Sequence, residues 1–203
     1  MTKRKYAGDQ VLQGNLIYLR RPTLDDAASG PWYSWFNDPE VTRFTEHGKK
    51  HHTRQDQIEF FRAFQGDETR EVFAICDSKN HGHIGTVSLQ EIDLDSGTAD
   101  IAVVIGDRDY WGTTAATESL DLAAQYGFNN LKLKKFTAGS YAANVPMNLT
   151  LVRLGMKIHS TVVDAYQYDD GKTCDKIEWE ATQSDWKSIV PLDGVMTSRQ
   201  EQG

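Results

Sequence analysis

One continuous stretch, from Ala99 to Phe128, constrains the fold of this 203-residue chain more than any other part of it. It opens with a short β-branched run, Ile101 to Gly106, which is typical of a mostly buried strand. After the polar residues 107–111, small and helix-favouring residues follow, and apolar side chains recur at three- and four-residue spacing. The stretch therefore predicts a strand, a short turn and a long amphipathic helix in immediate succession.

The start of this helix has two interpretations. Residues 112–116 read Gly-Thr-Thr-Ala-Ala, and the first N–H groups of any helix have no partner within it. Because the helix dipole is positive at this end, backbone N–H groups of the turn are able to hold a diphosphate. The alternative is an ordinary strand-to-helix connection in which the small residues serve packing.

Composition argues against several function classes. The formal net charge of −7 disfavours a general nucleic-acid binder, because such proteins neutralise phosphates with a basic face. No apolar run approaches the ~18 residues of a membrane span, and the polar N-terminus does not resemble a signal peptide. The two cysteines, Cys76 and Cys174, lack the companions of a disulfide framework or a zinc site. We therefore expect a cytoplasmic protein with no metal, nucleic-acid or membrane partner.

The remaining pattern predicts one mixed α/β domain over residues 15–185, with polar tails at 1–14 and 186–203. Strands are expected over residues 15–22, 71–77, 84–92, 101–106, 131–138, 156–168 and 172–182, and helices over 25–36, 54–65, 144–154 and from 113 onward. Gly30-Pro31 interrupts the first helix and would split it in two. The expected order is β-α-α-β-β-β-α-β-α-β-β.

Four motifs give the chain a resemblance to a known superfamily. Residues 110–118 (YWGTTAATE) resemble a YWGKGYATE pyrophosphate turn, and residues 137–144 (TAGSYAAN) resemble a TAG-x-YA-x-N stretch. Residues 153–156 resemble a K-x-G-F helix end, and residues 37–44 resemble an LNDPEV-x-R-[FY] opening. In this order and spacing, over nearly all of residues 15–182, they resemble the GNAT superfamily of acetyl-CoA-dependent N-acetyltransferases, within the branch of Rim-type and amino-sugar enzymes.

The resemblance implies a mostly antiparallel sheet flanked by helices, with acetyl-CoA as co-substrate and no metal. It implies that backbone groups of Val103, Val104 and Ile105 hold the acetyl and pantetheine arm. The implied diphosphate site is Trp111, Gly112, Thr113, Thr114, Ala115 and Ala116, and Asn144 would bind the pantetheine end.

Acetyl transfer to an amine also needs a base for the ammonium group and an acid for the leaving thiolate. Relatives of this branch often carry an acid at the end of the strand before the central one, so Glu91 is the first candidate base. Asp93 and Asp100 are the alternatives. The family's usual acid is a tyrosine at the position of Leu151, and leucine has no proton to donate. Tyr141 is the substitute candidate acid.

The acceptor amine is less constrained. Its candidate binding residues are Arg43, Phe44, Glu46 and His47 in a polar loop, and Tyr166 on the late hairpin. A small molecule such as a nucleotide-linked amino sugar is the first expectation, followed by a polyamine or a protein N-terminus.

The rival class is a non-catalytic acyl-CoA-binding module. It is favoured by three departures from the family pattern: Thr114 for glycine, Met147 for serine and Leu151 for tyrosine. The apolar late hairpin also makes a homodimer an expected assembly.

Overall fold

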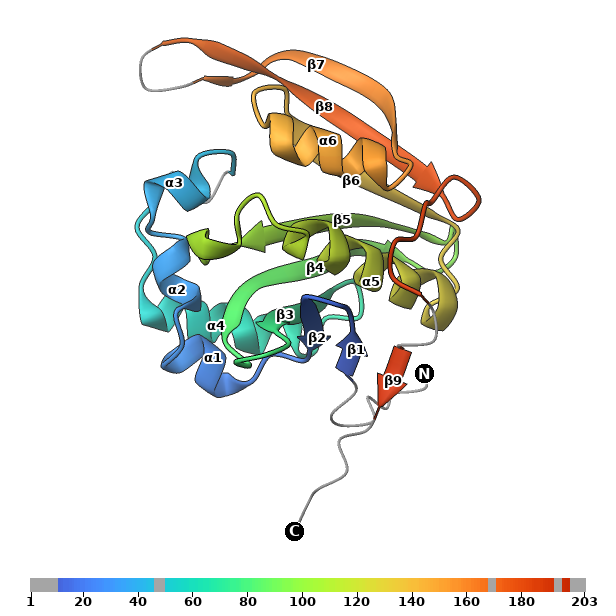
Figure 1. Ribbon diagram of the computed structural model, residues 1–203. Helices are drawn as coiled ribbons and strands as arrows, with labels where there is room; N and C mark the ends of the chain where they lie inside the picture. The colour runs from blue at the N-terminus through green and yellow to red at the C-terminus, as the bar shows by residue number, and fades with distance from the viewer. Residues whose placement is uncertain (1–10, 46–49, 168–170, 192–194, 198–203) are drawn as a thin grey trace.

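The computed structural model describes residues 11–45, 50–167, 171–191 and 195–197. A mixed sheet runs through the molecule in the order β7-β8-β6-β5-β4-β3-β2-β1-β9 (Figure 1). Its strands are β1 (Val11–Gln13), β2 (Ile17–Arg20), β3 (Glu71–Asp77), β4 (His83–Asp93), β5 (Thr98–Ile105), β6 (Lys135–Tyr141), β7 (Lys157–Gln167), β8 (Thr173–Thr182) and β9 (Val195–Thr197). Every neighbouring pair is antiparallel except β5 with β6, which are parallel. The predicted class, a mostly antiparallel sheet flanked by helices, is confirmed.

Helices cover both faces of this sheet. They are α1 (Leu24–Ala28), α2 (Trp32–Trp35), α3 (Pro39–Thr42), α4 (Arg54–Phe64), α5 (Ala115–Asn130) and α6 (Val145–Arg153), with a 3-10 turn at Arg108–Tyr110. Ile101 of β5 belongs to the main core together with α5, whereas Val104 packs against the aromatic residues of α2 and α4. Because successive strand residues point to opposite faces, α5 and the pair α2/α4 lie on opposite sides of β5. No helix in the described ranges is both long and apolar enough to cross a membrane.

The first helical region differs in detail from the sequence prediction. The helix expected over residues 25–36 is divided at Gly30-Pro31 into α1 and α2. The turn signal at 37–40 becomes the short helix α3, because Asp38 accepts a hydrogen bond from the Glu40 N–H as N-cap and Pro39 occupies the first turn.

The packed fold also extends beyond residues 15–185, the range that the sequence predicts. β1 pairs with β2 and with β9, and Leu12 is buried. At the other end Trp186 and Val190 pack in the main core. These segments have no helix or strand period, so their apolar residues gave no signal of burial.

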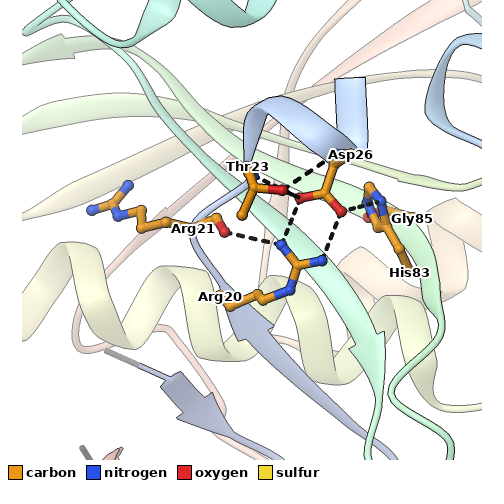
Figure 2. Close-up of polar contacts among 6 residues, drawn as sticks. All are labelled: Arg20, Arg21, Thr23, Asp26, His83 and Gly85. Atoms are coloured by element: carbon orange, nitrogen blue, oxygen red, sulfur yellow. Dashed lines mark hydrogen bonds and ion pairs between the residues drawn. The ribbon is translucent and has the colours of Figure 1, made fainter. Parts of the chain in front are cut away.

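A buried polar cluster joins α1 to β2 and β4. Figure 2 shows that the Asp26 carboxylate accepts hydrogen bonds from the two terminal nitrogens of Arg20, at 2.6 and 2.7 Å. The same carboxylate accepts the Thr23 N–H in a capping box. His83 approaches the same carboxylate at 3.4 Å and contacts the Gly85 carbonyl through its other ring nitrogen. Burial raises the pKa of Asp26, but the hydrogen bonds from Arg20 and Thr23, together with the nearby His83 ring, outweigh it and hold that pKa well below its ordinary value. The cluster is a structural tie between α1 and the sheet.

Asp26→Asn is expected to lower the free energy of unfolding by about 2–3 kcal/mol at pH 7. Breaking a fully buried pair costs more, about 3–5 kcal/mol, and the loss here is smaller because the Arg20 side chain is 28% exposed. Urea denaturation measures the change. Asp25→Asn, on the exposed side of the same helix turn, is the control and should shift stability by less than about 0.5 kcal/mol. Equal losses in both variants would show that the cluster does not hold α1.

Candidate functional site

The parallel strands β5 and β6 separate part-way along their length. Their pairing ends where Asp100 lies opposite Thr137, although β5 continues to Ile105 and β6 to Tyr141 (Figure 1). Over residues 101–105, β5 remains paired with β4 on its other side. Within the described part of the chain, this segment thus has one backbone edge without a neighbouring strand. Such an edge binds an extended ligand that carries its own amide groups.

The turn after β5 exposes backbone N–H groups. Gly112 takes a φ of +74°, and a Cβ built there would meet no atom within 4 Å. For the N–H groups of Thr114, Ala116 and Thr117, the described residues supply no hydrogen-bond acceptor. This turn leads into α5, whose N-terminus adds a favourable dipole. The open space and the free donors together suit an anionic ligand such as a diphosphate.

Thr114, where the family usually has glycine, fits this turn without strain. Its φ of −80° and ψ of 0° lie in the right-handed region, which any residue adopts. Its hydroxyl donates to the Glu118 carboxylate at 2.7 Å, so the side chain is held back against α5. Trp111 closes the other side of the turn, with its indole N–H donated to the Ile105 carbonyl at 2.9 Å.

A cavity of about 390 Å³ lies on the α2/α4 face of the sheet. The helices and the C-cap of α2 contribute Trp32, Phe36, Asp56, Gln57 and Phe60, and the loop before α4 contributes Lys50 and His52. The strands and the residue before β3 contribute Arg70, Val72, Thr86, Ser88, Gln90, Ala102, Val103 and Val104. Aromatic side chains from the helical side of the cavity therefore face polar side chains of the sheet, such as Ser88 and Gln90.

Asp100 is not itself among the described lining residues of this cavity, but it is the strand neighbour of the lining residue Gln90 and lies where the pairing of β5 with β6 ends. Asp100 of β5 pairs with Gln90 of β4, and two residues further along the strands Ala102 pairs with Ser88. Because alternate residues of a strand point to the same face, Asp100 lies on the face where Ser88 and Ala102 line the cavity. The Thr137 hydroxyl donates to its carboxylate at 3.2 Å. Burial, together with the nearby charge of Glu91, raises the pKa of Asp100 to about 6, and the Thr137 hydrogen bond opposes the rise. A carboxylate that titrates near neutral pH is well matched to accept a proton from an ammonium group.

The other candidate bases are less well placed. Glu91 is exposed and sits at an irregularity of the β4–β5 pairing with a φ of +50°. Asp93 is also exposed, and its pKa is lowered by hydrogen bonds from Ser96 and Asp95 in the β4–β5 turn. These contacts make Asp93 a turn residue.

The candidate acid and pantetheine residues lie at the far end of β6. Tyr141 is half-buried, with its ring centroid 4.8 Å from that of Tyr166. Asn144 caps α6, since its side-chain oxygen accepts the Met147 N–H at 3.4 Å. Leu151 is 2% exposed and packs in the main core.

Of the acceptor residues expected from the sequence, the three that the structure describes do not line the cavity. Arg43 stacks on Phe44 at 5.0 Å, and neither they nor Tyr166 are among the described lining residues. Glu46 and His47 lie outside the described residues. The same loop does supply Lys50 and His52, whereas the sequence did not single out the lining residues Trp32, Gln57 and Arg70. The described residues also form no cluster of three His, Cys, Asp or Glu side chains able to hold a metal ion.

Comparison with known proteins identifies the fold and the family. An uncharacterized N-acetyltransferase p20 from Bacillus licheniformis is 26% identical over 168 residues, which cover 82% of this chain and 92% of that protein. A GNAT-family acetyltransferase from Bacillus anthracis has a TM-score of 0.72 at 16% identity, covering 86% of this chain and 99% of its own. The spermidine N-acetyltransferase of Vibrio cholerae, solved in complex with CoA and spermine, has a TM-score of 0.74 at 18% identity, covering 84% and 97%. Residues 17–157 match the model of the acetyltransferase (GNAT) domain. Because this match spans most of the chain, the protein belongs to the GNAT acetyltransferase family and is an acyltransferase.

Proposed function

We propose that the chain transfers the acetyl group of acetyl-CoA to a primary amine of a small molecule in a direct ternary complex. The observation that carries the proposal is the position of Asp100. The free edge of β5 begins at this residue and its strand neighbour Gln90 lines the cavity, so Asp100 would act as a base between an acyl donor on that edge and an amine in the cavity.

The residues present fit acetyl-CoA. The free edge of β5 at Val103 to Ile105 would offer backbone groups to the two amides of the pantetheine arm, although the Ile105 carbonyl already accepts the Trp111 indole N–H. The N–H groups of Thr114, Ala116 and Thr117 would hold the diphosphate, in the space that Gly112 leaves open. When bound, acetyl-CoA supplies an activated thioester carbonyl for attack.

In the proposed mechanism Asp100 accepts the proton of the acceptor ammonium, directly or through one water, and so frees the amine lone pair. Unpaired N–H groups of β5 would stabilise the negative charge that develops on the carbonyl oxygen. Since Leu151 has no donor, we propose that Tyr141 protonates the leaving thiolate across the gap between β5 and β6.

For the acceptor, we propose a nucleotide-linked amino sugar first, on the resemblance of residues 37–44 to the opening of the amino-sugar branch. A polyamine is the second candidate, because the Vibrio cholerae relative in fold carries spermine. A protein N-terminus is the third. Release of free thiol from acetyl-CoA with a panel of these amines tests the activity. Measurable CoA binding with no turnover on any amine would instead support a non-catalytic acyl-CoA-binding module.

A homodimer is also proposed, through the edge strand β7. Ile158, Val162 and Val163 are exposed to 59%, 46% and 70% on this strand. An apolar edge strand of this length is a ready surface for a second copy.

Asn144→Asp is expected to weaken acetyl-CoA binding about 3- to 10-fold without loss of stability. Aspartate preserves the cap on α6 but removes the side-chain N–H₂ that is proposed to reach the pantetheine end. Asn144→Ala should weaken binding similarly and also destabilise the fold by about 1 kcal/mol, the value of a lost cap. Titration calorimetry and urea denaturation separate the two effects. Unchanged affinity in the aspartate variant would remove Asn144 from the cofactor site.

A further inference from the structure

The cavity is lined by cations and unpartnered donors rather than by carboxylates. Lys50 and Arg70 both line it, and Asp56 is the one carboxylate among its described lining residues. That carboxylate is already engaged, since it accepts the N–H and the hydroxyl of Thr53 at 2.7 and 2.9 Å in the capping box of α4. Among the described lining residues, two cationic side chains therefore stand against one carboxylate, although the whole chain is acidic.

The guanidinium of Arg70 is only weakly neutralised. Its closest ion-pair partner is Asp67, at 3.9 Å, and the carboxylate of Asp67 also accepts hydrogen bonds from Thr69 at 2.6 and 2.9 Å. In the described part of the chain, no hydrogen bond is found to the guanidinium of Arg70, which is 5.8 Å from the Phe60 ring. A half-buried guanidinium with free donors suits a carboxylate or a phosphate.

Two further donors at this cavity have no partner. Trp32 and Gln57 are 1% and 5% exposed, and within the described residues neither the Trp32 indole N–H nor the Gln57 side-chain N–H₂ has an acceptor. Buried donors without partners are rare in folded proteins and need an explanation such as an absent ligand. Both residues line the cavity, so oxygen atoms of a bound molecule would satisfy them after small side-chain adjustments.

The pairing of β3 with β4 and of β4 with β5 places Arg70 and Asp100 at opposite ends of one row of residues that runs across the sheet. Glu71, the first residue of β3, pairs with Leu89, and Gln90 pairs with Asp100. Extended by one residue, this register places Arg70, directly before β3, beside Gln90 of β4 and in one row with Asp100 of β5. Adjacent strands are about 4.8 Å apart, which separates the backbones of Arg70 and Asp100 by about 10 Å. A small molecule can reach both residues at once.

We infer that the acceptor is an amine that also carries an anionic oxygen group, a carboxylate or a phosphate, which Arg70 binds while the amine faces Asp100. The inference rests on the proposed amine acetylation and narrows it. A polyamine lacks such a group, and its several ammonium groups would meet Lys50 and Arg70 with no free carboxylate in the described lining. Both an amino acid-like acceptor and a phosphorylated amino sugar satisfy the chemistry.

Binding is tested by titration calorimetry in the presence of CoA, so that the readout does not depend on turnover. Two matched pairs separate carboxylate from phosphate: 4-aminobutanoate with 4-amino-1-butanol, and glucosamine 6-phosphate with glucosamine. At least one anionic amine should bind 10-fold or more tightly than its neutral partner and than spermidine. Arg70→Gln should abolish that preference without changing the affinity for the neutral amine, and Arg70→Lys should restore part of it. Trp32→Phe should weaken only the anionic member, by a few-fold.

Arg62→Gln, at an exposed position of α4 outside the cavity lining, is the matched control and should change no affinity. Equal binding of neutral and anionic amines, tighter binding of spermidine, or an equal loss for both members of a pair in Arg70→Gln would overturn the inference. Thiol release is measured separately. If an anionic amine binds through Arg70 but no amine is acetylated, the proposed function fails and the anion site stands.

Discussion

Asp100→Asn is expected to lower kcat/KM for acetyl transfer about 100- to 10,000-fold, the usual contribution of a general base. Asparagine keeps the shape of the side chain and a polar contact to Thr137, but it cannot take a proton from the ammonium group. The same exchange at Glu91, the candidate favoured by the sequence, should change kcat/KM less than about threefold, because Glu91 is exposed on the irregular part of β4. A large loss in Glu91→Gln with a small loss in Asp100→Asn would reverse the assignment.

The pH profile provides a second test of Asp100. Since a base acts in its ionised form, kcat/KM of the wild-type protein should rise with pH through about 6, the pKa of Asp100, and then level. In Asp100→Asn, kcat/KM should be lower at every pH and should no longer rise through pH 6. Initial rates from pH 5 to 8 at constant ionic strength show the difference.

Stability should change in the direction opposite to activity. The pKa of Asp100 is raised from 3.8 to about 6 in the folded protein, so its stabilising contribution is present below pH 3.8 and is lost as pH rises through 6. At pH 7 the ionised, half-buried carboxylate therefore costs stability, and asparagine should recover on the order of 1–3 kcal/mol. A carboxylate with a purely structural role would lose stability and activity together.

How much of this site the sequence could predict depends on whether the signal is local. The strand, turn and helix around Gly112 follow from residues within one stretch, and their prediction is confirmed by β5 and α5. The motif comparison drew attention to Thr114, but the left-handed backbone conformation lies at Gly112, which only the folded turn reveals.

The cavity depends on register instead. Arg70, Gln90 and Asp100 share a row only because three strands pair in one alignment, and a shift of one residue would turn each side chain to the other face. Nothing in the sequence near any of these residues specifies its partner. For the same reason, the sequence placed acceptor binding on the loop around Arg43, and it did not single out Trp32 or Gln57.

Asp121→Ala is expected to lower the free energy of unfolding by about 3–5 kcal/mol, the largest stability loss among these variants. Asp121 is 0% exposed in the middle of α5 and accepts four hydrogen bonds from the segment that follows β8. The donors are the Trp186 indole at 2.9 Å, the Ser188 hydroxyl at 2.9 Å and the N–H groups of Ile189 and Val190 at 2.8 Å. Alanine would leave the Trp186 indole and the Ile189 and Val190 N–H groups without this acceptor, whereas the exposed Ser188 hydroxyl still reaches the Val190 carbonyl at 3.0 Å. Each unsatisfied buried donor costs about 1–3 kcal/mol unless water reaches it.

The same variants measure how much residues 186–190, which the sequence places in a polar tail, contribute to the stability of the fold. If Asp121 anchors this segment, Asp121→Asn should lower the free energy of unfolding less than Asp121→Ala, because the asparagine side chain keeps one oxygen that accepts part of these hydrogen bonds. Asn129 is exposed near the end of the same helix, so Asn129→Ala is the control and should change the free energy of unfolding by less than about 0.5 kcal/mol. Urea denaturation gives the free energies, and hydrogen exchange at Ile189 and Val190 reports the segment itself. Fast exchange of these amides in wild-type protein, or a loss below 1 kcal/mol in Asp121→Ala, would mean that the core ends before Trp186, and that the packing of its ring against Phe128 and Phe136 adds little stability.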